Sequence, residues 1–88
     1  MKIHPDFTIQ QVGSTYVAVP VGEASKRFHG MLQLNETAAF LWHCMVDRDC
    51  TEADLIDALL QEYQIDRETA TNDVGRIVAL LSENGIFA

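Results

Sequence analysis

The change from strand to helix falls within the segment Leu34-Asn35-Glu36-Thr37-Ala38-Ala39-Phe40-Leu41-Trp42. Asn35 is a favoured helix N-cap, and Glu36 places a negative charge in the first turn, where the helix dipole stabilises it. The apolar residues that follow recur at helical spacing and predict one buried face: Ala38, Leu41, Trp42 and Met45. We interpret Trp42 as a core anchor, because aromatic residues at this spacing usually pack inward.

The residues before Asn35 predict three short strands. Residues 7–12 and 15–19 are β-prone and are separated by Gly13-Ser14, which suits a two-residue hairpin turn with glycine first. Pro20 cannot donate to a ladder, so the second strand ends there or lies at a sheet edge. Residues 21–26 predict a loop. Residues 28–34 predict a third strand, with Leu32 and Leu34 facing the core and Gly30 as a bulge.

The residues after Asn35 predict three helices. Thr51 is the N-cap of the second helix, and Asp54 three residues later is close to a capping box. Asp66 caps the third helix. Near the C-terminus, Gly85 is typical of the residue after a helix, and Ile86 can then pack back as in a Schellman motif. The apolar stripes of the last two helices are Leu55, Ile56, Leu59, Leu60 and Tyr63, and Ala70, Val74, Ile77, Val78 and Leu81.

The predicted order is three N-terminal antiparallel strands followed by three helices. With 88 residues, the chain is expected to form one domain over residues 1–88. Because isolated hairpins are marginal in water, the strands need the helices to cover their apolar face. The fold class is therefore α+β, with a winged helix-turn-helix-like arrangement.

Charge weighs against several classes of partner. Six Lys and Arg stand against thirteen Asp and Glu, giving a formal net charge of -7. An acidic protein repels nucleic-acid phosphates and anionic membrane surfaces. The predicted second helix has no Lys or Arg, whereas a helix that reads DNA needs them. A winged helix that binds nucleic acid or regulates transcription is nevertheless the alternative function. With no signal-like N-terminus and no run of ~18 apolar residues, the expected compartment is the cytoplasm.

The chain offers no convincing catalytic or metal constellation. Cys44 and Cys50 are the two cysteines, and with His43, His4 and His29 they lack the paired spacing of zinc sites. His43 and Cys44 are adjacent on a helix, so their side chains point about 100° apart and do not face each other. The paired carboxylates are interpreted as caps and solvated faces. We expect no catalytic residue, no metal ligand and no cofactor.

The third predicted strand offers a binding surface through its backbone. An edge strand has unpaired ladder groups, and an extended peptide can add to it as a further strand. The last helix could wall such a groove through residues beside its core stripe, although a solvated helix face is an equal interpretation of that flank. These residues are Asp73, Arg76, Ile77 and Leu80.

Several stretches resemble the PqqD-like family, the pyrroloquinoline quinone biosynthesis protein D group. The resemblance covers nearly the whole chain and is most specific in residues 34–38 with Leu41-Trp42. The stretches that carry it are Val19-Pro20-Val21-Gly22-Glu23, Phe28-His29-Gly30-Met31 and residues 34–42, followed by Thr51 with Asp54-Leu55, residues 59–63, Asp73-Val74 through Leu80-Leu81, and Gly85-Ile86.

The resemblance implies a non-catalytic peptide-recognition element. Members of such a family bind the leader of a ribosomally made precursor peptide as a strand beside the third strand. They present it to a modifying enzyme, typically a radical SAM protein. The resemblance does not fix whether the precursor belongs to the quinone pathway or to another peptide product. An exposed edge can also pair with a second copy, so a homodimer is open.

The resemblance also implies which residues bind the peptide. In the third strand the peptide-binding residues are Phe28, Gly30, Met31, Leu32 and Gln33. The groove helix contributes Asp73, Arg76, Ile77 and Leu80.

Overall fold

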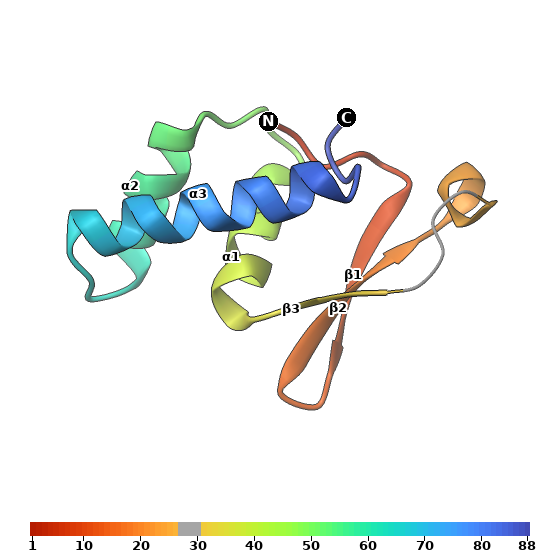
Figure 1. The fold of residues 1–88 in the computed structure, drawn as a ribbon, viewed down its shortest axis with the longest axis horizontal. Coiled ribbons are helices and arrows are strands. Elements are labelled where there is room, and N and C mark those ends of the chain that lie inside the picture. The colour runs from red at the N-terminus through yellow and green to blue at the C-terminus, as the bar shows by residue number, and fades with distance from the viewer. Residues whose placement is uncertain (27–30) are drawn as a thin grey trace.

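The computed structural model describes residues 1–26 and 31–88. Figure 1 shows the helices gathered on one side of the molecule, with the hairpin of the first two strands reaching away from them. The order of strands and helices and the α+β class are as predicted. The elements are β1 (Phe7–Val12), β2 (Thr15–Pro20), the 3-10 helix η1 (Gly22–Lys26), β3 (Leu32–Leu34), α1 (Glu36–Met45), α2 (Glu52–Glu62) and α3 (Arg67–Glu83).

The three strands form one antiparallel sheet in the order β1-β2-β3. The predicted hairpin turn is confirmed: Val12 pairs with Thr15, and Gly13 has a φ of 63°. No described residue other than glycine has a positive φ, so Ser14 does not, and this combination is that of a type II′ turn. Glycine at the first position is therefore what allows a two-residue connection here.

One hydrogen bond fixes which way the backbone of each strand points. The Val21 N–H donates to the Asp6 carbonyl at 2.7 Å, so these opposite residues form a hydrogen-bonded pair. Hydrogen-bonded pairs alternate along an antiparallel ladder, so the odd-numbered residues of β2 direct their backbone groups toward β1. The even-numbered residues, Tyr16 and Ala18, direct theirs toward β3, where they face Leu34 and Leu32.

Two predictions for residues 21–34 need correction. The segment predicted as a loop contains the 3-10 helix η1, in which the Ser25 hydroxyl donates to the Gly22 carbonyl at 2.7 Å. The third strand begins at Leu32, later than predicted. Met31 precedes the strand, and residues 28–30 of the predicted strand lie outside the described residues. The expected bulge at Gly30 lies outside the described residues.

The helices cover one face of the sheet and enclose a single apolar core. On β2 and β3 the core face carries Ala18 and Leu34, which are 0% and 3% exposed. Val17 and Val19 point to the opposite face and are half-buried. Trp42 is 1% exposed, which confirms its interpretation as a core anchor. The other large buried side chains are Leu41, Met45, Leu55, Leu59, Val74, Leu81 and Ile86.

The helix ends are closed as the sequence predicts. The Ala38 N–H donates to Asn35 Oδ1 at 2.8 Å, and Thr51 and Asp54 form a complete capping box. The Thr69 N–H donates to Asp66 Oδ1 at 2.8 Å. At the other end of α3, a further set of bonds completes the Schellman motif. These are Ile86 N–H to the Leu81 carbonyl and Gly85 N–H to the Ser82 carbonyl, both at 3.1 Å, with Gly85 at a φ of 68°.

The two chain ends meet beside the helices. The Ile3 N–H donates to the Met45 carbonyl at 3.0 Å, and the Ala88 N–H donates to the Lys2 carbonyl at 2.9 Å. Ile3 itself is 4% exposed and belongs to the core. Figure 1 shows the N- and C-termini close to each other on the side of α3 away from the hairpin.

Within residues 1–26 and 31–88, no helix is both long and apolar enough to cross a bilayer.

Candidate functional site

The outer edge of β3 carries backbone groups that the sheet does not use. Within the described residues β3 is the last strand of the sheet, with β2 on one side only. Leu32 and Leu34 direct their backbone groups toward β2, because they face Ala18 and Tyr16 in hydrogen-bonded pairs. Gln33 lies between them and therefore directs its N–H and C=O outward. One residue thus offers both a donor and an acceptor to a strand placed alongside.

A hollow of about 260 Å³ lies between this edge and α3. Four of the sequence-predicted binding residues line it, which are Gln33, Arg76, Ile77 and Leu80. The structure therefore brings together the strand and helix positions that the sequence placed in one groove. Three further lining residues were not predicted, namely Leu34, Asn35 and Ala38. They lie at the turn from β3 into α1, so their part in the groove depends on how α3 packs over that turn.

The hollow has an apolar floor and a polar rim. Leu34, Ala38 and Ile77 are each 3% exposed, and Leu80 is half-buried. The Asn35 Oδ1 atom already accepts the Ala38 N–H, so it serves the helix rather than the groove. Burial of an apolar side chain here stabilises a complex by roughly 25 cal/mol per Å² of apolar surface removed from water. The hollow is thus more favourable to an apolar side chain than to a charged one.

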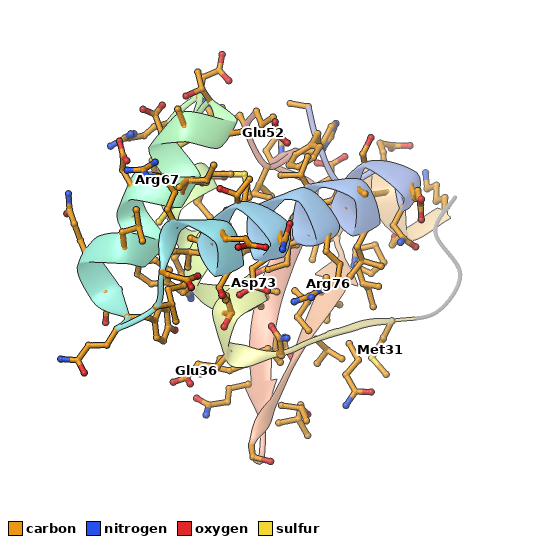
Figure 2. The ribbon with its side chains drawn as sticks, turned by 60° about the vertical axis from the view of Figure 1, so that its left-hand side comes forward. Met31, Glu36, Glu52, Arg67, Asp73 and Arg76 are labelled. Carbon is orange, nitrogen blue, oxygen red and sulfur yellow. The ribbon has the colours of Figure 1, made fainter. Side chains whose placement is uncertain are left out.

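A charged side chain of α3, that of Arg76, lines this groove. Arg76 donates to Asp73 Oδ1 at 3.0 Å, and its side chain is 65% exposed while that of Asp73 is 23% exposed. Figure 2 shows Arg76 reaching from α3 into the space between that helix and β3. Asp73 lies one turn earlier on the helix and holds Arg76 without lining the hollow.

The remaining predicted binding residues lie apart from the hollow. Leu32 packs half-buried against the core, and Met31 precedes β3 with 70% of its surface exposed. Figure 2 places Met31 toward the start of the strand, away from α1. Phe28 and Gly30 lie outside the described residues.

A second hollow continues the edge toward the hairpin tip. It measures about 420 Å³ and shares Gln33, Leu34 and Asn35 with the first. Its other walls are polar, from Ser14 and Thr15 on the hairpin and Glu36 at the start of α1. The open edge of β3 is therefore flanked by an apolar hollow beside α3 and a polar one beside the hairpin.

The thiols lie in a separate hollow of about 470 Å³ between α1 and α2. Burial, and secondarily the nearby Cys50, raise the pKa of the Cys44 thiol above its ordinary value. The Cys50 Sγ atom donates to the Cys44 carbonyl at 3.3 Å. A nucleophilic cysteine needs the opposite, a lowered pKa. Among the described residues, no group of three His, Cys, Asp or Glu side chains is placed to hold a metal ion.

Comparisons with known proteins give one family model and two structures of similar fold. The family model for coenzyme PQQ synthesis protein D matches residues 13–86. A solved structure of lasso peptide synthetase B1 complexed with the leader peptide is 28% identical, with a TM-score of 0.70 over 97% of this chain and 93% of that chain. A structure of TbiB1 in complex with the TbiA(beta) leader peptide is 17% identical, with a TM-score of 0.73 over 98% of this chain and 93% of that one. No curated protein sequence matches the chain.

Proposed function

The chain belongs to the family of coenzyme PQQ synthesis protein D, and from this membership we propose that it binds the leader of a ribosomally made precursor peptide. In this proposal residues 1–88 act as one domain, and the leader adds as a strand to the open edge of β3. The observation that carries the proposal is Gln33, whose outward backbone groups lie beside an apolar hollow walled by α3. The similar lasso peptide synthetase B1 has itself been solved with a leader peptide bound.

Strand addition fits what the edge offers. The main-chain bonds to Gln33 supply affinity without regard to sequence, and the hollow beside Ile77 and Leu80 supplies specificity. Alternate side chains of an added strand point to opposite faces of the sheet, so every second leader residue is directed toward α3. Met31 and Leu32 then border the added strand at its other end, and Phe28 and Gly30 stay predicted contacts.

The proposed role is that of an adaptor without catalysis. The described residues that line the hollow between β3 and α3 include no Ser, Cys, His, Asp or Glu that could act as nucleophile or general base. The chain would therefore hold the precursor for a separate modifying enzyme. As the family resemblance implies, that enzyme would be a radical SAM protein, and the two would meet in the cytoplasm.

A substitution at Gln33 tests strand addition directly. Gln33→Pro replaces the outward N–H and the side chain with a ring and leaves the bonds between β2 and β3, so an edge strand should tolerate it. The probe is a synthetic leader peptide from the short open reading frame nearest this chain's gene. We expect Gln33→Pro to weaken binding at least about tenfold, because the peptide carbonyl loses its donor in a desolvated site. Gln33→Ala keeps the N–H and should stay within about threefold of the unsubstituted protein.

Backbone amide shifts locate the binding site in the same titration. We expect the shifts to cluster at Gln33 and along residues 73–80. Unchanged affinity in a folded Gln33→Pro protein would show that the peptide does not add at this edge. A homodimer formed through the same edge would compete with the peptide, and would appear as a fall in molecular mass when the peptide is added.

A further inference from the structure

One positive charge lines an otherwise uncharged hollow. Of the seven described residues around the hollow between β3 and α3, Arg76 alone carries a charge. The protein as a whole has a formal net charge of -7, so its long-range field repels an acidic peptide. A cation at this point is a local exception, and it meets whatever lies in the hollow.

Among residues 1–26 and 31–88, Arg76 has one ion-pair partner, which leaves most of its N–H donors available. The guanidinium contacts Asp73 Oδ1 at 3.0 Å, three residues earlier on the same helix. Arginine has five N–H donors in a planar fork that matches a carboxylate with two parallel bonds. With the Arg76 side chain 65% exposed, an exposed ion pair of this kind contributes little stability and is easily exchanged.

The spacing of the helix matches that of a strand. Arg76 and Leu80 are one turn apart on α3, a rise of about 6 Å. Two side chains on the same face of a strand are separated by about 6.6 Å, since each residue rises about 3.3 Å. In the proposed complex the added strand runs along α3, so that when one of its residues fills the hollow against Ile77 and Leu80, the residue two positions nearer Arg76 comes within reach of the guanidinium.

We propose that Arg76 selects leaders carrying one Asp or Glu two positions from the apolar residue that occupies the hollow. This inference rests on the proposed peptide-binding function. The carboxylate takes the two-bond fork of the guanidinium, and the single contact to Asp73 is released or shared. The rest of the leader is neutral or basic, because the net charge of the domain disfavours additional acidic residues.

Selection from a random peptide library tests this without requiring the sequence of the natural leader. A phage-displayed library of random 12-residue peptides is selected on the full chain, on Arg76→Glu and on Arg67→Glu. Arg67 is the matched control: it lies in the first turn of α3, is 70% exposed, is absent from the lining of the hollow, and its substitution changes the net charge equally. Circular dichroism and amide spectra establish that each variant is folded.

The expected result is a reversal of charge preference at one position. Peptides selected on the unsubstituted chain and on Arg67→Glu carry Asp or Glu two residues from an aliphatic or aromatic residue. Peptides selected on Arg76→Glu carry Lys or Arg at that same position. A synthetic winner with Glu should bind the unsubstituted chain about tenfold more tightly than its Gln counterpart, and the difference should shrink as salt is raised.

Two contrary results have different meanings. In the first, the selected peptides shift the Gln33 amide resonance but show no acidic preference, or they show the same acidic preference on Arg76→Glu. Charge selection by Arg76 is then wrong, and strand addition stands. If no selected peptide shifts Gln33 or the amides of residues 73–80, the proposed function itself fails, and this inference fails with it.

Discussion

The helix ends and the outer edge of β3 treat their backbone polar groups in opposite ways. Asn35, Thr51 and Asp66 each accept an N–H from the first turn that follows, and Gly85 and Ile86 satisfy carbonyls at the end of α3. Gln33 lies in a three-residue strand and directs its N–H and C=O away from the sheet. These helix ends are therefore satisfied within the chain, whereas Gln33 leaves an outward donor and acceptor that an added strand could use.

Substitutions of two neighbouring leucines on α3 should show the largest difference between the core and the groove. Leu81 is 0% exposed in the core, and Leu80 is half-buried and lines the hollow beside β3. We expect Leu81→Ala to lower the free energy of unfolding by about 2–5 kcal/mol, because it removes buried methyl groups and leaves a cavity. Leu80→Ala should cost less than about 1.5 kcal/mol and should weaken peptide binding instead. Urea denaturation and a peptide titration of both variants measure the two effects.

Equal losses of unfolding free energy in Leu80→Ala and Leu81→Ala would contradict this distinction between groove and core. Such a result would mean that the groove wall stabilises the fold as much as the core does, and that the hollow is incidental to packing. A loss of affinity in Leu81→Ala alone, with the protein still folded, would place the binding surface on another face of α3.

The helix caps could be predicted from the sequence because each depends on residues that are close together in the chain. Caps and the Schellman motif need a particular side chain within three or four positions of the groups that it satisfies. The sequence therefore predicted Thr51 with Asp54, Asp66 and Gly85 correctly, together with the order of strands and helices. The third strand was predicted from residue 28, whereas Met31 lies outside it, because the extent of an edge strand depends on its pairing with β2 and not on nearby residues alone.

The groove could be predicted only in part for the same reason. Gln33, which the family resemblance implied, and Arg76, Ile77 and Leu80, which lie beside the core stripe of the last helix, line the hollow, and their part in binding stays a prediction. The sequence did not predict that Leu34, Asn35 and Ala38 line the hollow. Each has another role in its own segment, because Leu34 and Ala38 pack in the core and Asn35 caps α1. Their second role arises only where α3 crosses the turn between β3 and α1. The outward direction of the Gln33 backbone required the register of all three strands.

Acid titration distinguishes a charged cap from a neutral one at the start of α3. Hydrogen bonds from the side chain and the backbone of Thr69 lower the pKa of Asp66 below its ordinary value. A lowered folded-state pKa stabilises the protein above the unfolded value near pH 3.8, and this stabilisation is lost as pH falls through the lower folded value. We expect Asp66→Asn to change the melting temperature little at pH 7, because Asn caps well, and to make its decline between about pH 5 and 2 shallower.

The matched control for this titration is an exposed carboxylate outside any cap. Glu83→Gln, in the last turn of α3, removes one negative charge without removing a cap. A decline equally shallow in Glu83→Gln would mean that net charge, rather than the bonds to Asp66, sets the acid sensitivity.

The smallest expected effect concerns the thiols, which lie between α1 and α2, away from the edge of β3. Burial is the first cause that raises the Cys44 pKa, and the nearby Cys50 is the second. Less thiolate is then present at about pH 8 than in a free thiol, so iodoacetamide should alkylate Cys44 more slowly than glutathione. In Cys50→Ala, which isolates Cys44, the main cause remains and the reaction should stay slow, rising only at higher pH. The same variant in guanidinium should react at the free rate. A folded Cys44 that outpaced glutathione at this pH would mean an activated thiol, and the hollow between α1 and α2 would then be a second reactive region rather than a closed one.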